Sequence, residues 1–316
     1  FINPTFNDSK WQSVTVPHDW AIYGPFSSQN DKQEVAIAQD GQTEAMEHAG
    51  RTGGLPFVGV GWYRTEFEVP QFTDGKRATI LFDGAMSHAK VYVNGQEVGY
   101  WPYGYNSFYF DITKQLIPGK KNTLAVRLEN LPESSRWYPG AGLYRNVHVV
   151  TTEKIHVPVW GTQITTPYVK DEYASVCLRT TILNAEKTEL TVVTDIMDAD
   201  GQVVSTKTNK GVINHGQPFT QNFIVERPKL WSPETPVLYK AVSKIYSGDT
   251  LLDTYSTRFG IRTIEYIADK GFYLNGKRRK FQGVCNHHDL GPLGAAINVA
   301  ALRHQLTLLK EMGCDA

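Results

Sequence analysis

Hydrophobic and polar residues alternate over short stretches in the first half of the chain. A two-residue period places successive side chains on opposite faces of a strand. It predicts strands at 61–69, 78–83, 89–93, 104–112, 122–130 and 146–150. Asn94-Gly95, directly after the third of these, favours a tight hairpin. Short strands separated by turn residues are typical of a β-sandwich or barrel, which we expect for residues 1–152.

Residues 24–61 interrupt this pattern. The stretch is rich in Gly, Gln and Ser and shows little periodicity. A long loop inside a compact domain often has a function. Phe26, Asn30, Asp31 and Arg51 are therefore candidates to line accessory binding positions, although an ordinary surface loop explains the stretch equally well.

The alternation continues in residues 153–262. It predicts strands at 174–183, 190–198, 217–225 and 238–246, separated by polar turns. The spacing corresponds to about seven short strands in roughly a hundred residues, which is typical of an immunoglobulin-like sandwich. The segment lacks the cysteine pair of antibody domains.

The last fifty residues combine three patterns. A hairpin is predicted at 263–280 around Asn275-Gly276. An apolar run at 281–285, predicted to be a strand, then leads into the polar group His287, His288 and Asp289. Apolar residues at helical spacing predict a helix over 298–312, with Asn298 as N-cap and Gly313 just past its end. Strand, loop and helix in this order predict a βα unit, in which ligands bind beyond the carboxyl end of the strand.

Charge and cysteine content exclude several classes of partner and cofactor. The formal net charge of zero gives no reason to expect nucleic acid or an anionic membrane surface. No apolar run is long enough to cross a bilayer. The three widely spaced cysteines show neither a disulfide framework nor zinc-ligand spacing. Neighbouring side chains on a strand point to opposite faces, which argues against a metal ion between His287 and His288. We expect no metal and no other cofactor.

Several motifs occur in a fixed order along the whole chain. They are Pro17-His18-Asp19-Trp20, Gly61-Trp62-Tyr63-Arg64, Val91-Tyr92-Val93-Asn94-Gly95, Arg136-Trp137-Tyr138, Leu230-Trp231-Ser232-Pro233, Leu274-Asn275-Gly276-Lys277 and Asn286-His287-His288-Asp289. In this combination the chain resembles glycoside hydrolase family 2, and within it the β-galactosidase-like members.

The resemblance implies a mainly β architecture in three parts. These are a jelly-roll sugar-binding domain at 1–152, an immunoglobulin-like β-sandwich at 153–262 and, at 263–316, the first βα unit of an incomplete TIM-barrel catalytic domain. Family members hydrolyse β-glycosides with retention, using two glutamates on later barrel strands. A complete barrel needs about 250 residues. We therefore expect no catalytic residue within this chain and no activity from it alone.

The resemblance also implies substrate-binding residues. His287 matches a histidine at the end of the first barrel strand that hydrogen-bonds sugar hydroxyls, and His288 and Asp289 follow it. Arg136 and Trp137 lie on a loop that reaches the barrel mouth in the family. Structural roles remain open for all five: a loop contact for the histidines, loop capping for Asp289, a carboxylate partner for Arg136 and interdomain packing for Trp137.

The expected function is that of an exo-β-glycosidase acting on carbohydrate, first a β-galactosidase and otherwise a β-glucuronidase or β-mannosidase. A homo-oligomer is left open, and the long loops favour a periplasmic or secreted protein. Two other classes stay open: a non-catalytic carbohydrate-binding or adhesion module, and a structural spacer without a ligand. The βα unit and His287 favour the enzyme, since neither alternative needs them.

Overall fold

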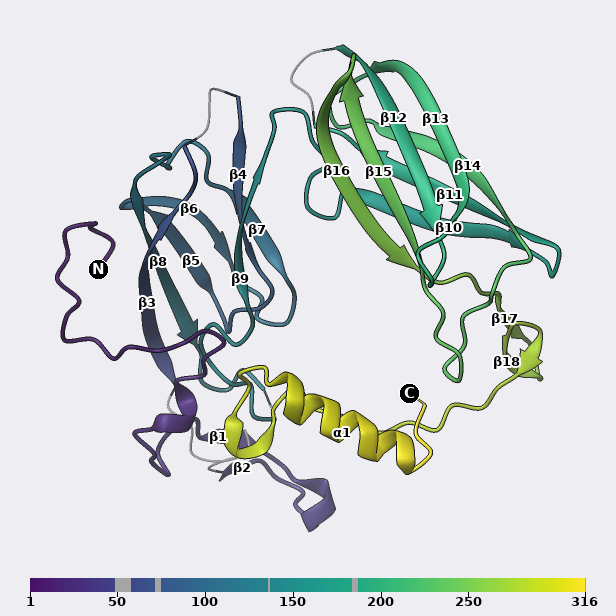
Figure 1. Ribbon diagram of the computed structural model, residues 1–316. Coiled ribbons are helices and arrows are strands. Elements are labelled where there is room, and N and C mark those ends of the chain that lie inside the picture. The colour runs from purple at the N-terminus through teal and green to yellow at the C-terminus, as the bar shows by residue number, and fades with distance from the viewer. Residues whose placement is uncertain (49–57, 72–74, 136, 184–186, 316) are drawn as a thin grey trace. The chain divides into compact units, whose positions relative to one another are not determined.

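The computed structural model describes residues 1–48, 58–71, 75–135, 137–183 and 187–315 (Figure 1). They form two compact units, one of Phe1–Thr151 with Cys285–Met312 and one of Thr152–Val284 with Gly313–Ala316. Strands dominate both units, and α1 (Val299–Glu311) is the one α-helix of the described part. The predicted mainly β fold is confirmed.

Two facing sheets build the first unit. One has the order β3 (Gly59–Glu68), β8 (Lys121–Asn130), β5 (Ala89–Val93) and β6 (Gln96–Trp101). The other has the order β7 (Phe108–Asp111), β4 (Arg77–Phe82) and β9 (Val147–Thr152). Alternate residues of β4 and β5 are buried, as their two-residue period predicts. Ile80 and Phe82 from one sheet meet Val91, Val126 and Leu128 from the other in a single apolar core.

The excursion at 24–61 contains more regular structure than its sequence suggests. After the short 3₁₀ turn η1 (Ala21–Tyr23), β1 (Gln33–Val35) pairs with β2 (Met46–His48), and a second 3₁₀ turn, η2 (Ala38–Asp40), lies between them. Gln33 donates to the carbonyl of Ser135 at 2.8 Å, and buried Asp31 accepts from the amide of Glu133 at 2.6 Å. The excursion is thereby tied to the loop that follows β8. Arg51 lies outside the described residues.

The second unit is a sandwich of a three-stranded and a four-stranded sheet. Its strands are β10 (Thr162–Val169), β11 (Tyr173–Thr181) and β14 (Pro218–Glu226) in one sheet, and β13 (Val203–Ile213), β12 (Thr188–Met197), β15 (Tyr239–Ser247) and β16 (Thr250–Phe259) in the other. All of the neighbouring strands pair antiparallel. Leu178, Phe223 and Ile196 are buried between the sheets. The seven strands agree with the number expected for this segment.

The hairpin predicted around Asn275-Gly276 is present. β17 (Ile264–Ile267) pairs with β18 (Gly271–Leu274), which pairs with β19 (Lys277–Arg278). Asn275 and Gly276 both have positive φ, 51° and 71°, the conformation required in the commonest two-residue hairpin turn.

The strand predicted at 281–285 is wrong. These residues have no strand structure and are exposed. A strand exists through hydrogen bonds to a neighbouring strand. Here the described partner is a single residue, Asp315, whose amide donates to the carbonyl of Gln282 at 2.8 Å. The helix prediction is confirmed: α1 begins after Asn298, whose side chain accepts from the amide of Ala301 at 3.0 Å. Gly313 follows the helix with a φ of 91°.

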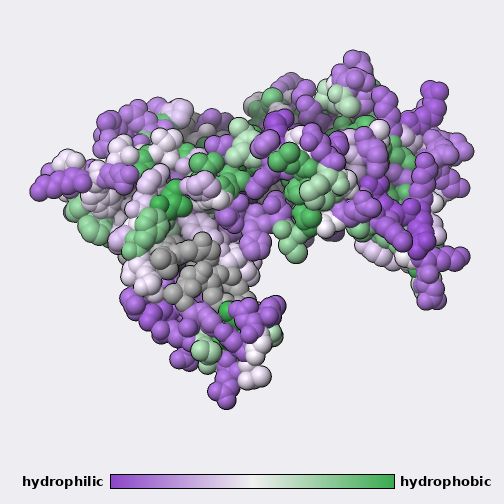
Figure 2. Space-filling view, turned by 90° about the horizontal axis from the view of Figure 1, so that it is seen from below, coloured by the Kyte–Doolittle hydropathy of each residue, from purple (hydrophilic) through white to green (hydrophobic). Residues whose placement is uncertain are grey.

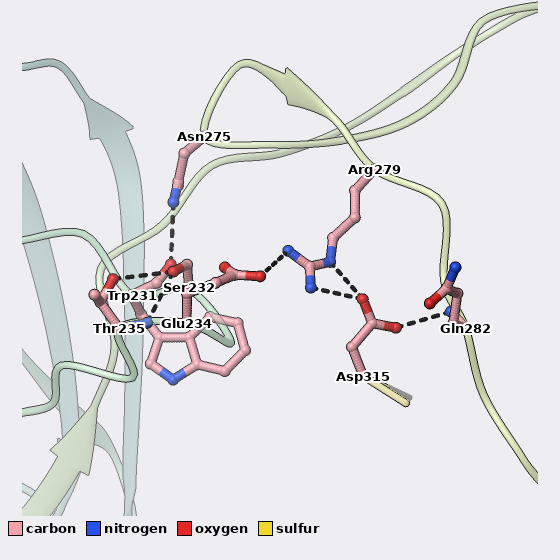
Figure 3. Close-up of polar contacts among 8 residues, drawn as sticks. All are labelled: Trp231, Ser232, Glu234, Thr235, Asn275, Arg279, Gln282 and Asp315. Carbon is pink, nitrogen blue, oxygen red and sulfur yellow. Dashed lines mark hydrogen bonds and ion pairs between the residues drawn. The ribbon is translucent and has the colours of Figure 1, made fainter. Parts of the chain in front are cut away.

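Arg279 holds together the end of the second unit. Figure 3 shows its guanidinium between two carboxylates, 2.8 Å from Glu234 and 2.6 Å from Asp315. Asp315 also accepts from the amide of Gln282 at 2.8 Å. The side chain of Asn275 donates to the carbonyl of Trp231, so the hairpin is attached to the corner at 231–235. On the face seen in Figure 2, polar residues prevail and apolar residues form small separate patches.

Asp315 should make this attachment sensitive to acid. The Gln282 amide and then the Arg279 guanidinium lower the pKa of Asp315 below its ordinary value of 3.8. A lowered pKa means that the stabilisation is complete above pH 3.8 and is lost as the pH falls through the folded-state pKa. Replacing Asp315 by Asn should therefore reduce the hydrogen-exchange protection of the residue 315 amide at about pH 5, with the difference from the unsubstituted chain vanishing on acidification.

The matched control is Asp249→Asn, on the exposed turn between β15 and β16. It should leave the protection of the residue 315 amide unchanged throughout. A difference between Asp315→Asn and the unsubstituted chain that stays constant with pH would contradict the assigned role.

Candidate functional site

The loop from β8 to β9 carries the first predicted site residue. Trp137 is 40% exposed, and its indole N–H donates to the hydroxyl of Tyr105 at 3.0 Å. Ser135 donates to the carbonyl of Trp137 at 2.7 Å. At the end of β8, buried Asn130 donates to the carbonyl of Gly140 at 3.1 Å. The loop is thus fixed at several points while the indole ring stays accessible.

His288 lies against this loop. Its Nε2 is 2.9 Å from the carbonyl of Pro139, which can only accept, so Nε2 carries the proton. The ring also contacts Tyr105 and Tyr144 edge-on, at centroid distances of 5.4 and 5.9 Å. His288 therefore has a clear structural contact, and its Nε2 already has a partner.

His287 differs from its neighbour because it is exposed. Its ring lies 5.9 Å from that of Trp137, in a T-shaped arrangement. An exposed indole offers an apolar face to a sugar ring, and an exposed imidazole offers a donor and an acceptor to its hydroxyls. The two side chains together have the chemistry of a saccharide-binding surface.

The structure brings four of the five predicted residues into one region. Trp137, His287 and His288 are linked by the contacts above. Asp289 is half-buried, and its charge contributes to the raised pKa of Tyr138, the residue after Trp137. Arg136 lies outside the described residues.

In the sequence, Asp19 stands out only as part of the motif Pro17-His18-Asp19-Trp20. Its carboxylate contacts both segments that carry the predicted site residues. The residue is 1% exposed. One oxygen, Oδ1, accepts from the amides of Ala21 and Ala141 at 2.9 and 3.1 Å. The other, Oδ2, accepts from the hydroxyl of Tyr138 at 2.6 Å and from the amide of Ala295 at 2.8 Å. The carboxylate thus joins three segments that are far apart in the sequence.

Two glycines allow these segments to come close. Gly140 and Gly294 have φ values of 69° and 65°, which L side chains rarely adopt. A Cβ on Gly294 would lie 2.5 Å from Asp19 Oδ2, and one on Gly140 would lie 2.3 Å from the side chain of Ala295. Any larger residue at either position would force the segments apart.

Burial raises the pKa of three tyrosines in this region. Burial, followed by the charge of Asp19 and its hydrogen bond, raises the pKa of Tyr138 well above its ordinary range. Burial likewise raises the pKa of Tyr63, and it raises the pKa of Tyr144 to about 12. Tyr144 donates its hydroxyl to the carbonyl of Gly104 at 2.7 Å, and its own carbonyl accepts from the amide of Ile297 at 2.9 Å. It therefore supports both the loop before β7 and the segment before α1.

The sequence analysis also missed two aromatic residues beside Trp137. Tyr103 is 56% exposed and lies 5.5 Å from Tyr105, which is itself 6.4 Å from Trp137. The available signal was the aromatic cluster at 100–105, which overlaps the start of the strand predicted at 104–112. Together with Trp137 and His287 these rings form a continuous aromatic surface.

Other kinds of site find no support in the described residues. They contain no group of three or more His, Cys, Asp or Glu side chains placed to hold a metal ion. Among their helices, none is long and apolar enough to span a membrane.

Comparison with known proteins identifies the family. The model of the glycosyl hydrolases family 2 sugar binding domain matches residues 4–153, and the model named glycosyl hydrolases family 2 matches residues 155–262. The chain belongs to glycosyl hydrolase family 2. Its relatives in this family include a β-galactosidase of Bacteroides ovatus, 42% identical over 99% of this chain, and a putative β-glucuronidase of Formosa agariphila, 37% identical over all of it.

Solved structures are similar as well. A member from Bacteroides cellulosilyticus superposes with a TM-score of 0.89 at 33% identity, covering 99% of this chain and 39% of that one. A β-glucuronidase from Bacteroides uniformis gives a TM-score of 0.82 at 29% identity, covering 99% of this chain and 36% of that one. The chain spans only 35% and 28% of the lengths of the two curated relatives.

The raised pKa of Tyr144 predicts a loss of stability in alkali. Its folded-state pKa of about 12 exceeds the ordinary value of 10.0. The stabilisation is therefore complete below pH 10.0 and is lost as the pH rises through about 12. Between these values the free energy of unfolding, measured with denaturant, should fall more steeply for the unsubstituted chain than for Tyr144→Phe.

Tyr23→Phe serves as the control, because Tyr23 is 64% exposed. Its pH dependence should follow that of the unsubstituted chain. Equal slopes for all three proteins would show that Tyr144 ionisation is not linked to folding.

Proposed function

We propose that this chain is the front part of a retaining exo-β-glycosidase, most directly a β-galactosidase, that removes terminal β-linked sugars from oligosaccharides or polysaccharides. Its membership of family 2 and its 42% identity to the Bacteroides ovatus β-galactosidase support this. The observation that carries the proposal is the exposed pair Trp137 and His287, held on separate segments and 5.9 Å apart.

The roles of the site residues follow from their chemistry. Trp137 offers its ring face to the sugar, and His287 exchanges hydrogen bonds with sugar hydroxyls. His288, whose Nε2 already binds the carbonyl of Pro139, holds the segment in place and presents its remaining edge. Asp289 and Arg136 complete the polar surroundings in this proposal.

The assignment of domains along the chain is also part of the proposal. Residues 1–152 form the sugar-binding jelly roll, 153–262 the immunoglobulin-like sandwich, and 263–316 the start of the catalytic barrel. The acid/base and nucleophile glutamates of the retaining mechanism lie outside these residues. The chain's short share of its curated relatives supports this placement.

A β-glucuronidase is the second candidate. It is favoured by relatives with that name, including the Formosa agariphila protein at 37% identity and the Bacteroides uniformis structure. The two candidates differ in whether the substrate carries a carboxylate on its sugar ring, which a direct comparison of substrates resolves.

Activity should require the complete protein. The purified 316-residue chain should not hydrolyse aryl β-galactosides or aryl β-glucuronides, whereas the complete protein should hydrolyse one of them. In the complete protein, His287→Ala should lower kcat/KM by about 100-fold, as the loss of one hydrogen bond to the transition state does elsewhere.

His304→Ala is the matched control, since His304 is an exposed histidine on α1. It should leave kcat/KM unchanged. Turnover by the 316-residue chain would contradict the placement of the glutamates. Full activity of His287→Ala would remove His287 from the site.

A further inference from the structure

We propose that Asp19 is a positioning residue for the saccharide site: its buried carboxylate sets the placement of Trp137 relative to His287 and His288. The inference rests on the proposed function for its catalytic consequence only. Asp19 does not touch the substrate in this proposal. It acts through the two segments that carry the side chains which do.

The geometry of the four hydrogen bonds supports this role. Each carboxylate oxygen of Asp19 accepts two donors, so both are fully used. Ala21 is on the same segment as Asp19, and Tyr138 and Ala141 are on the loop between β8 and β9. Ala295 is on the segment that leads from His288 into α1. A shift of the carboxylate would therefore change the spacing between the two site-bearing segments directly.

The donors also lie close to the site in the sequence. Tyr138 directly follows Trp137, and Pro139, one residue further, accepts from His288. Ala295 packs with Met86, Tyr144 and Tyr138 in a small apolar cluster beside these hydrogen bonds. Tyr138 is thus adjacent to the side chain that it places, and Ala295 lies seven residues after His288.

An isosteric change separates the role of the carboxylate from that of its volume. Asparagine has the shape of aspartate, but one of its two terminal groups is an NH₂ donor. Every partner of Asp19 donates a hydrogen bond. Asp19→Asn must therefore lose two of the four bonds, whichever way the amide is turned. The new NH₂ group also faces two hydrogen-bond donors, which repel it.

The chain offers a matched control at the other end of β8. Asn122 is fully buried and also makes four hydrogen bonds, two as donor to the carbonyls of Ile117 and Lys120 and two as acceptor from the amide of Ile117 and the side chain of Asn94. The site loop begins where β8 ends, whereas Asn122 lies at its start. Asn122→Ala removes all four of these bonds from the same sandwich, two more than Asp19→Asn loses, without touching either site segment.

The first experiment is steady-state kinetics on the complete protein, at a temperature where circular dichroism shows each variant folded. Asp19→Asn should lower kcat/KM by about 100-fold, mostly in kcat, because displaced groups fail chiefly in the transition state. Asn122→Ala should lower Tm and leave kcat and KM unchanged. Equal kinetics for Asp19→Asn and Asn122→Ala would overturn the proposal.

The second experiment does not depend on activity, so it separates a failure of this inference from a failure of the proposed function. In the 316-residue chain, the nitrogen-bound proton signals of the His288 ring and the Trp137 indole should shift or broaden in Asp19→Asn and stay in place in Asn122→Ala. Tyr138→Phe removes only one donor and should shift the same signals less. This variant still tests the proposal if Asp19→Asn does not fold. Unmoved signals in both Asp19→Asn and Tyr138→Phe would overturn the proposal even if the complete protein is an active glycosidase.

Discussion

A single buried carboxylate is the constraint on which the candidate site depends. Burying a charge is costly unless polar groups compensate it fully. Asp19 meets this condition with four donors from three segments, at distances from 2.6 to 3.1 Å. The same requirement fixes the segments, because each donor must reach the carboxylate. The two positive-φ glycines, Gly140 and Gly294, are then needed for the close approach.

The β-sandwich beneath gives this arrangement its rigidity. Its core is a continuous set of buried aliphatic and aromatic residues drawn from both sheets, and the site residues are on the loops that leave it. Function is commonly placed on loops that a rigid scaffold positions. Here the loops between β6 and β7 and between β8 and β9 supply Tyr105 and Trp137. The segment before α1 adds His287 and His288 through Asp19 and Tyr144.

The sequence predicted the architecture well where burial alternates strongly. β5 and β15 have such patterns and were placed within a few residues. Within the second unit, β10, β13 and β16 had no predicted range, and all three are edge strands of their sheets. β13 shows why, since most of its residues are exposed and little apolar alternation remains. The strand prediction for 281–285 is wrong for the opposite reason. The apolar pattern there is strong, but these residues have no neighbouring strand in the described chain.

The site itself was only partly predictable. The motif at 286–289 and the loop at 136–138 indicated two segments that the structure brings together. Nothing local to Asp19 showed that three of its four partners would come from residues more than a hundred positions away, because such contacts arise only when the sandwich closes. The small sheet of β1 and β2 was missed for a similar reason: Gln33 and Asp31 find their partners in the distant loop after β8.

Hydrogen exchange in the unsubstituted chain tests the central claim most directly. If the Asp19 carboxylate holds the segment before α1 onto the sandwich, the amides of Ala141 and Ala295 should exchange as slowly as those of β8, because opening them requires a break in the same buried network. Rapid exchange at Ala295, with β8 still protected, would show that the segment is not held by Asp19 and would contradict the claim.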